Sequence, residues 1–185
     1  MDMTKTNTNN RLSTKDIAYI ALGAALLAIC SWISIPTTVP FTLQTFAVFA
    51  ILALLGGMRG TIAILVYILL GAVGAPVFAG PSGGLGILLG NTGGYIVGFL
   101  LTGLIYWGAT KLFKRSLVVE VIALLLGLIA CYALGTIWFM IVYARDAEAI
   151  GAMTALSWCV FPFILPDIAK LVLGLVVARR VRPVL

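Results

Sequence analysis

Residues 117–143 read LVVEVIALLLGLIACYALGTIWFMIVY, an apolar run longer than the roughly 20 residues that a helix needs to cross a bilayer. Five more apolar runs accompany it: Ile17–Ile35, Phe41–Gly57, Gly60–Gly74, Gly93–Ala109 and Leu156–Ala178. The composition is that of a chain in lipid, because 62% of the 185 residues are hydrophobic and only 10% are charged. The sequence therefore predicts an all-α integral membrane protein with six transmembrane helices.

Polar or basic segments flank the predicted membrane domain at both ends. Residues 1–16 begin with a stretch rich in Thr and Asn, which predicts a disordered cytoplasmic N-terminus. Residues 17–178 are predicted to form the six-helix membrane domain, and residues 179–185 a basic cytoplasmic tail. No room remains for a separate soluble catalytic domain.

Basic residues between the runs predict the orientation in the membrane. With six spans, ten of them fall on one side: Lys5, Arg11, Lys15, Arg59, Lys111, Lys114, Arg115, Arg179, Arg180 and Arg182. The other side carries only Arg145, close to Asp146 and Glu148. Because cytoplasmic connections are enriched in Lys and Arg, both termini are predicted to be cytoplasmic. This scattered distribution, without a patch of basic and aromatic residues, argues against nucleic acid as a partner.

The connections on the opposite side are rich in residues that break helices. Pro36–Thr45 joins the first two spans, and Ala75–Thr92 joins the third and fourth. The second segment has too many Gly and Pro residues for a regular helix and too many apolar residues for a solvated loop. We expect this outer loop to fold over the bundle, where its backbone, Gly84 included, helps to form a site. A compact extracellular cap without a ligand role is the alternative.

The last apolar run contains two charged residues, Asp167 and Lys170, directly after Pro166. In a helix, their i, i+3 spacing places both side chains on one face. Charged side chains at this depth are costly, so they usually face the bundle interior and mark a binding or transport path. The alternative is an ion pair that only locks two helices together, and the two interpretations are compatible.

The sequence lacks the residues of common catalytic and cofactor sites. It has no histidine, and its three cysteines show no CxxC spacing, so we predict no metal site and no enzyme activity. Asp167 is the only carboxylate expected within the membrane. No nucleotide-binding motif is present and no cofactor is predicted, so the energy for active transport must come from an ion gradient or a partner protein.

Small residues on the first span predict a docking surface for another helix. Ala21, Ala25 and Ala28 share one face at helical spacing, and such a smooth stripe allows close approach. Packing against the protein's own helices is the alternative.

Five segments together carry a resemblance to a known family. They are Pro40–Thr45, Gly56–Gly60, Gly71–Phe78, Gly90–Tyr95 and Pro166–Lys170. Through these segments, which are spread along the sequence, the chain resembles the BioY family over nearly its whole length. The resemblance implies a six-helix biotin-binding S component of an energy-coupling factor transporter in a bacterial plasma membrane. Its implied partners are a transmembrane coupling subunit and two ABC-type ATPases.

The resemblance also implies roles for individual residues toward biotin, which has a ureido ring, an apolar body and a carboxylate. Asp167 is expected to accept from the ureido N–H groups, with Asn91 beside it. Lys170 is expected to meet either the carboxylate or the ureido carbonyl. The remaining expected contacts are an apolar wall from Tyr95, Phe78 and Trp32, and a carboxylate contact from Gln44 or backbone amides of the first outer connection.

One departure from the family concerns Asn91, since many members have proline at this position. The function implied by the resemblance is high-affinity capture of biotin from outside for ATP-driven uptake. Two alternatives stay open: a membrane structural or assembly protein, and a stand-alone ion-coupled carrier.

Overall fold

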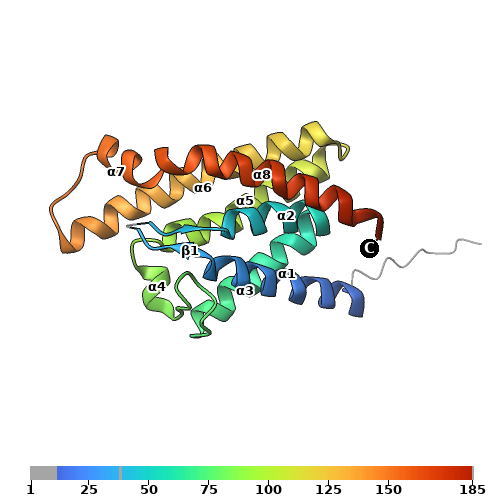
Figure 1. The fold of residues 1–185 in the computed structure, drawn as a ribbon, viewed down its shortest axis with the longest axis horizontal. Coiled ribbons are helices and arrows are strands. Elements are labelled where there is room, and N and C mark those ends of the chain that lie inside the picture. The colour runs from blue at the N-terminus through green and yellow to red at the C-terminus, as the bar shows by residue number, and fades with distance from the viewer. Residues whose placement is uncertain (1–11, 38, 185) are drawn as a thin grey trace, which may run out of the picture.

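The computed structural model describes residues 12–37 and 39–184, so most of the predicted N-terminal segment lies outside the described residues. Helices make up most of the described chain, as the apolar runs predict (Figure 1). In chain order the elements are α1 (Thr14–Trp32), β1 (Ser34–Ile35), β2 (Phe41–Thr42), α2 (Gln44–Leu55), α3 (Gly57–Ala72), α4 (Leu85–Leu89), α5 (Gly93–Leu112), α6 (Leu117–Asp146), α7 (Ala152–Cys159), α8 (Phe161–Val181) and the 3-10 helix η1 (Arg182–Val184).

Within the described residues, four helices, α1, α5, α6 and α8, are long and apolar enough to cross a membrane. The second and third predicted spans coincide with α2 and α3, which are apolar but have only 12 and 16 residues. At 1.5 Å per residue they extend about 18 and 24 Å, less than the roughly 30 Å of a bilayer core. The mostly helical architecture is confirmed, and the count of six spans stays a prediction.

The helices at both ends of the chain extend beyond the predicted membrane domain. α1 begins at Thr14, because Ser13 and Asp16 form a capping box: Ser13 N donates to Asp16 Oδ2 at 2.9 Å, and Asp16 N donates to Ser13 Oγ at 3.2 Å. Residues 14–16 are therefore helical. At the other end, α8 and η1 continue the helical structure to Val184, through the predicted basic tail.

The last apolar run forms two helices instead of one. α7 ends at Cys159, and the next residue, Val160, has φ −125° and ψ −57°. Pro162 stands in the first turn of α8, where its missing N–H needs no partner, whereas it could not continue the helix before it.

The connection between α1 and α2 is a short antiparallel hairpin, which departs from the all-α prediction. Ser34 pairs with Thr42, and Ile35 with Phe41. In Figure 1 this hairpin lies toward the same end of the molecule as α4 and α7, while the C-terminus and the start of α1 lie at the opposite end. The segment after α3 packs on the end of α1, where Ser31 Oγ donates to Val77 O at 2.5 Å and Trp32 Nε1 donates to Pro76 O at 2.8 Å.

Glycines bring α5 and α6 into close contact. A Cβ atom at Gly98 would lie 2.7 Å from Cys131 Sγ and 3.0 Å from Cys131 Cα, too close for any real side chain. Such close approach is the usual means by which helices associate in lipid. It places Tyr95 of α5 and Tyr132 of α6 beside the same cavity.

Candidate ligand-binding site

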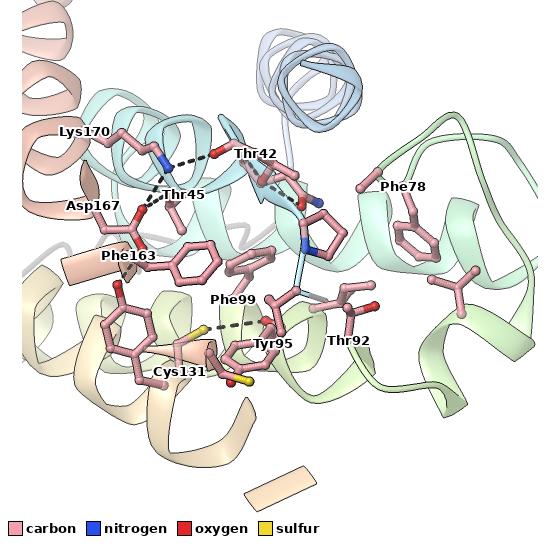
Figure 2. A pocket seen from close by; sticks show the side chains of 18 of the residues that line it. Thr42, Thr45, Phe78, Thr92, Tyr95, Phe99, Cys131, Phe163, Asp167 and Lys170 are labelled. Carbon is pink, nitrogen blue, oxygen red and sulfur yellow. Dashed lines mark hydrogen bonds and ion pairs between the residues drawn. The ribbon is translucent and has the colours of Figure 1, made fainter. Parts of the chain in front are cut away.

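A cavity of about 210 Å³ lies between the hairpin, the start of α2, the segment between α3 and α5, and helices α5 to α8. Its lining is mainly apolar and aromatic, with a few polar side chains. Figure 2 shows Phe99, Phe163 and Tyr95 around the cavity, with Lys170 and Asp167 together at one side. This combination of an apolar body and few convergent polar groups is typical of small-molecule sites.

Asp167 and Lys170 form a buried ion pair on the wall of the cavity. Lys170 Nζ lies 2.9 Å from Asp167 Oδ1, and the side chains are 9% and 3% exposed, respectively. Lys170 Nζ also donates to Thr42 O of the hairpin at 2.7 Å and stands 4.3 Å from the centre of the Phe41 ring. The pair therefore ties α8 to the hairpin and faces the cavity at once.

The Asp167 carboxylate accepts two further hydrogen bonds from other helices. Thr45 of α2 donates from Oγ1 to Oδ1 at 2.8 Å, and Tyr132 of α6 donates from its hydroxyl to Oδ2 at 2.6 Å. With the lysine, Oδ1 has two donors and Oδ2 has one among the described residues. Because each carboxylate oxygen can accept about two hydrogen bonds, Oδ2 keeps one acceptor position for a ligand.

Close packing of α8 on α2 positions this network. A Cβ atom at Gly174 would lie 3.1 Å from Ala50 N, so the two helices approach closely here. Thr45 lies five residues before Ala50 on α2, and Asp167 lies seven residues before Gly174 on α8. The hydrogen bond between Thr45 and Asp167 therefore joins α2 and α8 at a second point, N-terminal to this close contact in both helices.

Three other predicted residues line the cavity. Gln44 is 6% exposed, and its Nε2 donates to Tyr67 Oη at 2.5 Å. Tyr95 shares a 3.0 Å hydrogen bond with Thr136 Oγ1. Phe78, 1% exposed, packs edge-on against Tyr67 with ring centres 5.5 Å apart.

The structure does not bring the last three predicted residues to the cavity wall. Trp32 is 46% exposed and supports the segment after α3 through its hydrogen bond to Pro76. Gly84 precedes α4 with φ +98°, a conformation that favours glycine, and its N–H donates to Gly71 O at 2.7 Å. Asn91 is partly buried between α4 and α5, and its neighbour Thr92 lines the cavity instead.

Sequence reasoning missed several lining residues, above all Tyr132 and Thr45. A tyrosine inside the longest apolar run is a signal, because a buried hydroxyl needs a hydrogen-bond partner. Its partner Asp167 lies 35 residues away in the chain, and Thr45 lies 122 residues from the same carboxylate. Two of the three cysteines, Cys131 and Cys159, also line the cavity as free thiols.

A second buried carboxylate is Glu120 of α6, which the sequence analysis did not single out. Glu120 is 1% exposed and accepts at Oε1 from Arg115 Nε and Arg182 Nη2, each at 2.6 Å, and from the Tyr106 hydroxyl at 3.1 Å. Both guanidinium groups also donate to Ala53 O of α2. These residues do not line the cavity, so this cluster joins helix ends elsewhere in the molecule.

Only part of the predicted docking stripe on α1 is exposed in the structure. Ala21 and Ala25 are exposed, whereas Ala28 is 7% exposed and belongs to the apolar core. Ala28 lies in the last turns of α1, close to the residues that carry the segment after α3. It is therefore not part of a free surface.

Comparison with known proteins gives consistent matches. The model of the BioY family matches residues 3–185. A probable biotin transporter BioY of Pyrococcus horikoshii is 36% identical over 173 residues, covering 92% of this chain and 98% of the relative. The biotin transporter BioY of Thermotoga maritima is 40% identical over 169 residues, covering 91% and 96%. A crystal structure of the S-component for biotin from an ECF-type ABC transporter superposes with a TM-score of 0.79 at 30% identity, covering 91% of each chain.

Proposed function

The chain belongs to the BioY family, and from this membership we propose that it is the biotin-capturing membrane subunit of an ATP-driven vitamin uptake transporter. It is a binding subunit and not an enzyme. The observation that carries the proposal is the cavity with Asp167 and Lys170 on its wall, in a chain that aligns over nine-tenths of its length with biotin transporters.

The free hydrogen-bonding positions of the pair suit a cyclic urea. Lys170 uses two of its three N–H donors among the described residues, and Asp167 keeps one acceptor position on Oδ2. One donor beside one acceptor matches the carbonyl and N–H of a ureido edge. We therefore assign the ureido carbonyl to Lys170, which leaves the carboxylate of biotin for another part of the cavity.

The rest of the ligand lies along the aromatic wall. Phe99, Phe163 and Tyr95 would contact the thiophane ring and the valeryl chain. The carboxylate would reach the side of Gln44 and Thr92, where hydroxyl, amide and backbone N–H groups can donate. Asn91 stays a predicted contact next to Thr92, while Trp32 and Gly84 support the surrounding backbone in this scheme. No cofactor is needed for binding.

We propose a topology of six crossings with both termini in the cytoplasm of a bacterial cell. The short helices α2 and α3 would form the second and third crossings, with the extended residues of the hairpin lengthening the path before α2. The excess of basic residues at the end that holds the C-terminus and the start of α1 supports this orientation (Figure 1). The cavity then opens toward the outside. A coupling subunit and two ABC-type ATPases would complete the transporter.

The test is a biotin titration of purified protein with the substitution Asp167→Asn. The amide keeps the size of the side chain but removes the charge. Its NH2 group, which replaces one carboxylate oxygen, cannot accept a hydrogen bond. We expect the affinity for biotin to fall at least tenfold, since hydrogen bonds to charged groups contribute about 1.5 to 3 kcal/mol.

The matched control is Asp16→Asn, the same change at a carboxylate at the start of α1 that is 15% exposed and lies outside the cavity. It should bind biotin like the wild type. Wild-type affinity in the Asp167→Asn protein would refute the assignment of this residue. A wild-type protein that binds no biotin would favour the structural or assembly alternative.

A further inference from the structure

A second hollow in the molecule lies away from the cavity, at the junction of α2 and α3. It has a volume of about 390 Å³ and is lined by Leu55–Arg59, by residues of the end of α5, and by Arg115 of the α5–α6 connection. Three of the lining residues are basic: Arg59, Lys111 and Arg115. They come from three different segments, so the fold gathers them. We call this hollow the basic groove.

The basic side chains keep hydrogen-bond donors for a ligand. Lys111 forms no ion pair within the described part of the chain, and Arg59 uses its Nε toward Asp16 at 2.7 Å. Arg115 uses Nε and Nη2 toward Glu120, Ala53 and Tyr106, while its Nη1 borders Gly56 without a described partner. Burial is the largest single influence and lowers the pKa of Arg115, but the hydrogen bonds and charge interactions with Glu120 and Tyr106 together raise the pKa above its usual value, so this guanidinium stays charged.

The charges around the groove do not cancel. Arg59, Lys111, Arg115 and Arg182 give four positive charges, and Asp16 and Glu120, their only described ion-pair partners, give two negative charges. An excess of two positive charges remains. The backbone adds to it, because α3 begins at Gly57 without a side-chain cap, and Gly57, Met58 and Arg59 of this positive helix end line the same hollow.

The location of the groove indicates the kind of anion. It lies among helix ends at the basic end of the bundle, and the indole-bearing residue Trp107 contributes to its lining. Tryptophan is enriched at the level of lipid headgroups, and basic pockets between transmembrane helices on the cytoplasmic side bind anionic headgroups.

We propose that the basic groove binds the phosphate of an anionic phospholipid headgroup from the inner leaflet. The phosphate contacts Lys111, Arg59 and Arg115 Nη1 beside the first turn of α3. The glycerol and acyl chains extend along the apolar surface of α5. This site is independent of the biotin cavity and holds the α2–α3 turn against α5.

The test measures binding of phosphatidylglycerol to the purified full chain in detergent by native mass spectrometry, with phosphatidylcholine of the same acyl chains as reference. We expect the wild type to prefer phosphatidylglycerol. The double substitution Arg59→Gln/Lys111→Gln should weaken phosphatidylglycerol binding about tenfold, since each basic group near the surface contributes severalfold. Lys111→Gln alone, at an exposed side chain that pairs with no described carboxylate, should give a smaller loss in the same direction.

The matched control is Arg179→Gln/Arg180→Gln, which removes two charges from the exposed face of α8 at the same end but outside the groove. It should bind phosphatidylglycerol like the wild type. Biotin binding by every variant reports correct folding separately from lipid binding.

Four results would overturn the proposal. The first is a wild type without preference for phosphatidylglycerol, and the second is an equal loss in the groove and control variants. The third is displacement of the lipid by millimolar inorganic phosphate, which would indicate a site for a soluble anion. Groove variants that bind lipid normally but fail to assemble with the coupling subunit would likewise refute it, as a protein contact would then explain the groove.

Discussion

Tyr132 determines how the carboxylate of Asp167 is presented to the cavity. Its hydroxyl donates to Oδ2, while Thr45 and Lys170 occupy Oδ1, so the one open acceptor position lies on the oxygen that Tyr132 holds. The tyrosine need not touch biotin to affect its binding. It acts by fixing the direction of the remaining lone pair.

We predict that Tyr132→Phe weakens biotin binding about three- to tenfold. The change removes one charge-assisted hydrogen bond and lets the carboxylate rotate, but it leaves the ring and the ion pair in place. Titration of purified protein measures the effect. Tyr143→Phe on the same helix, without a described hydrogen bond through its hydroxyl, should behave like the wild type, and equal affinities for all three proteins would show that Tyr132 has no positioning role.

Single residues of the site differ in how far the sequence could predict them. Asp167 and Lys170 could be found, because two charges inside an apolar run are costly enough to need a reason. Tyr132 and Thr45 could not be assigned, since their importance comes from contacts across 35 and 122 residues that depend on helix packing. The same holds in part for Glu120, whose burial is compensated by Arg182, 62 residues away, as well as by Arg115, five residues before it.

At the scale of the helices, α5 and α6 depend on glycine for their close packing. Gly98 faces Cys131 without room for a methyl group, whereas Gly108, on the same helix, has nothing within 4 Å of its hypothetical Cβ. The two positions therefore separate the effect of packing from that of helix propensity. In the middle of a helix, alanine is favoured over glycine by roughly 0.5 to 1 kcal/mol when space allows.

We predict that Gly98→Ala destabilises the protein by about 1 to 3 kcal/mol, because the methyl group must push the backbone of α6 away. The midpoint of thermal unfolding in detergent should fall by several degrees, and biotin should bind more weakly as Tyr95 and Tyr132 move apart. Gly108→Ala should leave the midpoint unchanged or raise it. A Gly98→Ala protein as stable as the wild type would mean that the two helices can separate at no cost.

The helices themselves were well predicted because a long apolar run has few alternatives in lipid. The break between α7 and α8 was missed although Pro162 marks it, since the run continues in apolar residues on both sides. The hairpin between α1 and α2 was missed because two residues per strand give no periodic pattern. Sequence thus indicated where helices exist, and tertiary contacts decided where they end.

On the scale of the whole molecule, the two buried clusters of charged residues have different roles. Asp167 and Lys170 line a cavity, whereas Glu120 and its arginines tie together the segments that contain Ala53, Tyr106 and η1. An S component of this design binds its ligand without hydrolysing ATP, so the binding step and the energy-consuming step can be tested separately. The exposed part of α1 is our proposed contact with the coupling subunit.

We predict that Ala21→Trp abolishes biotin uptake by proteoliposomes containing the complete transporter, while biotin binding to the isolated chain stays at the wild-type level. Ala21 is exposed and lies outside the cavity, so an indole there blocks close approach of another helix without disturbing the site. Ile129→Trp, at a 62% exposed position on α6, is the control for adding an indole to a surface in lipid and should transport normally. Normal uptake by Ala21→Trp would show that the docking surface does not include this face of α1. Biotin accumulation by the chain alone along a sodium or proton gradient would show that it is an ion-coupled carrier that needs no partner subunits.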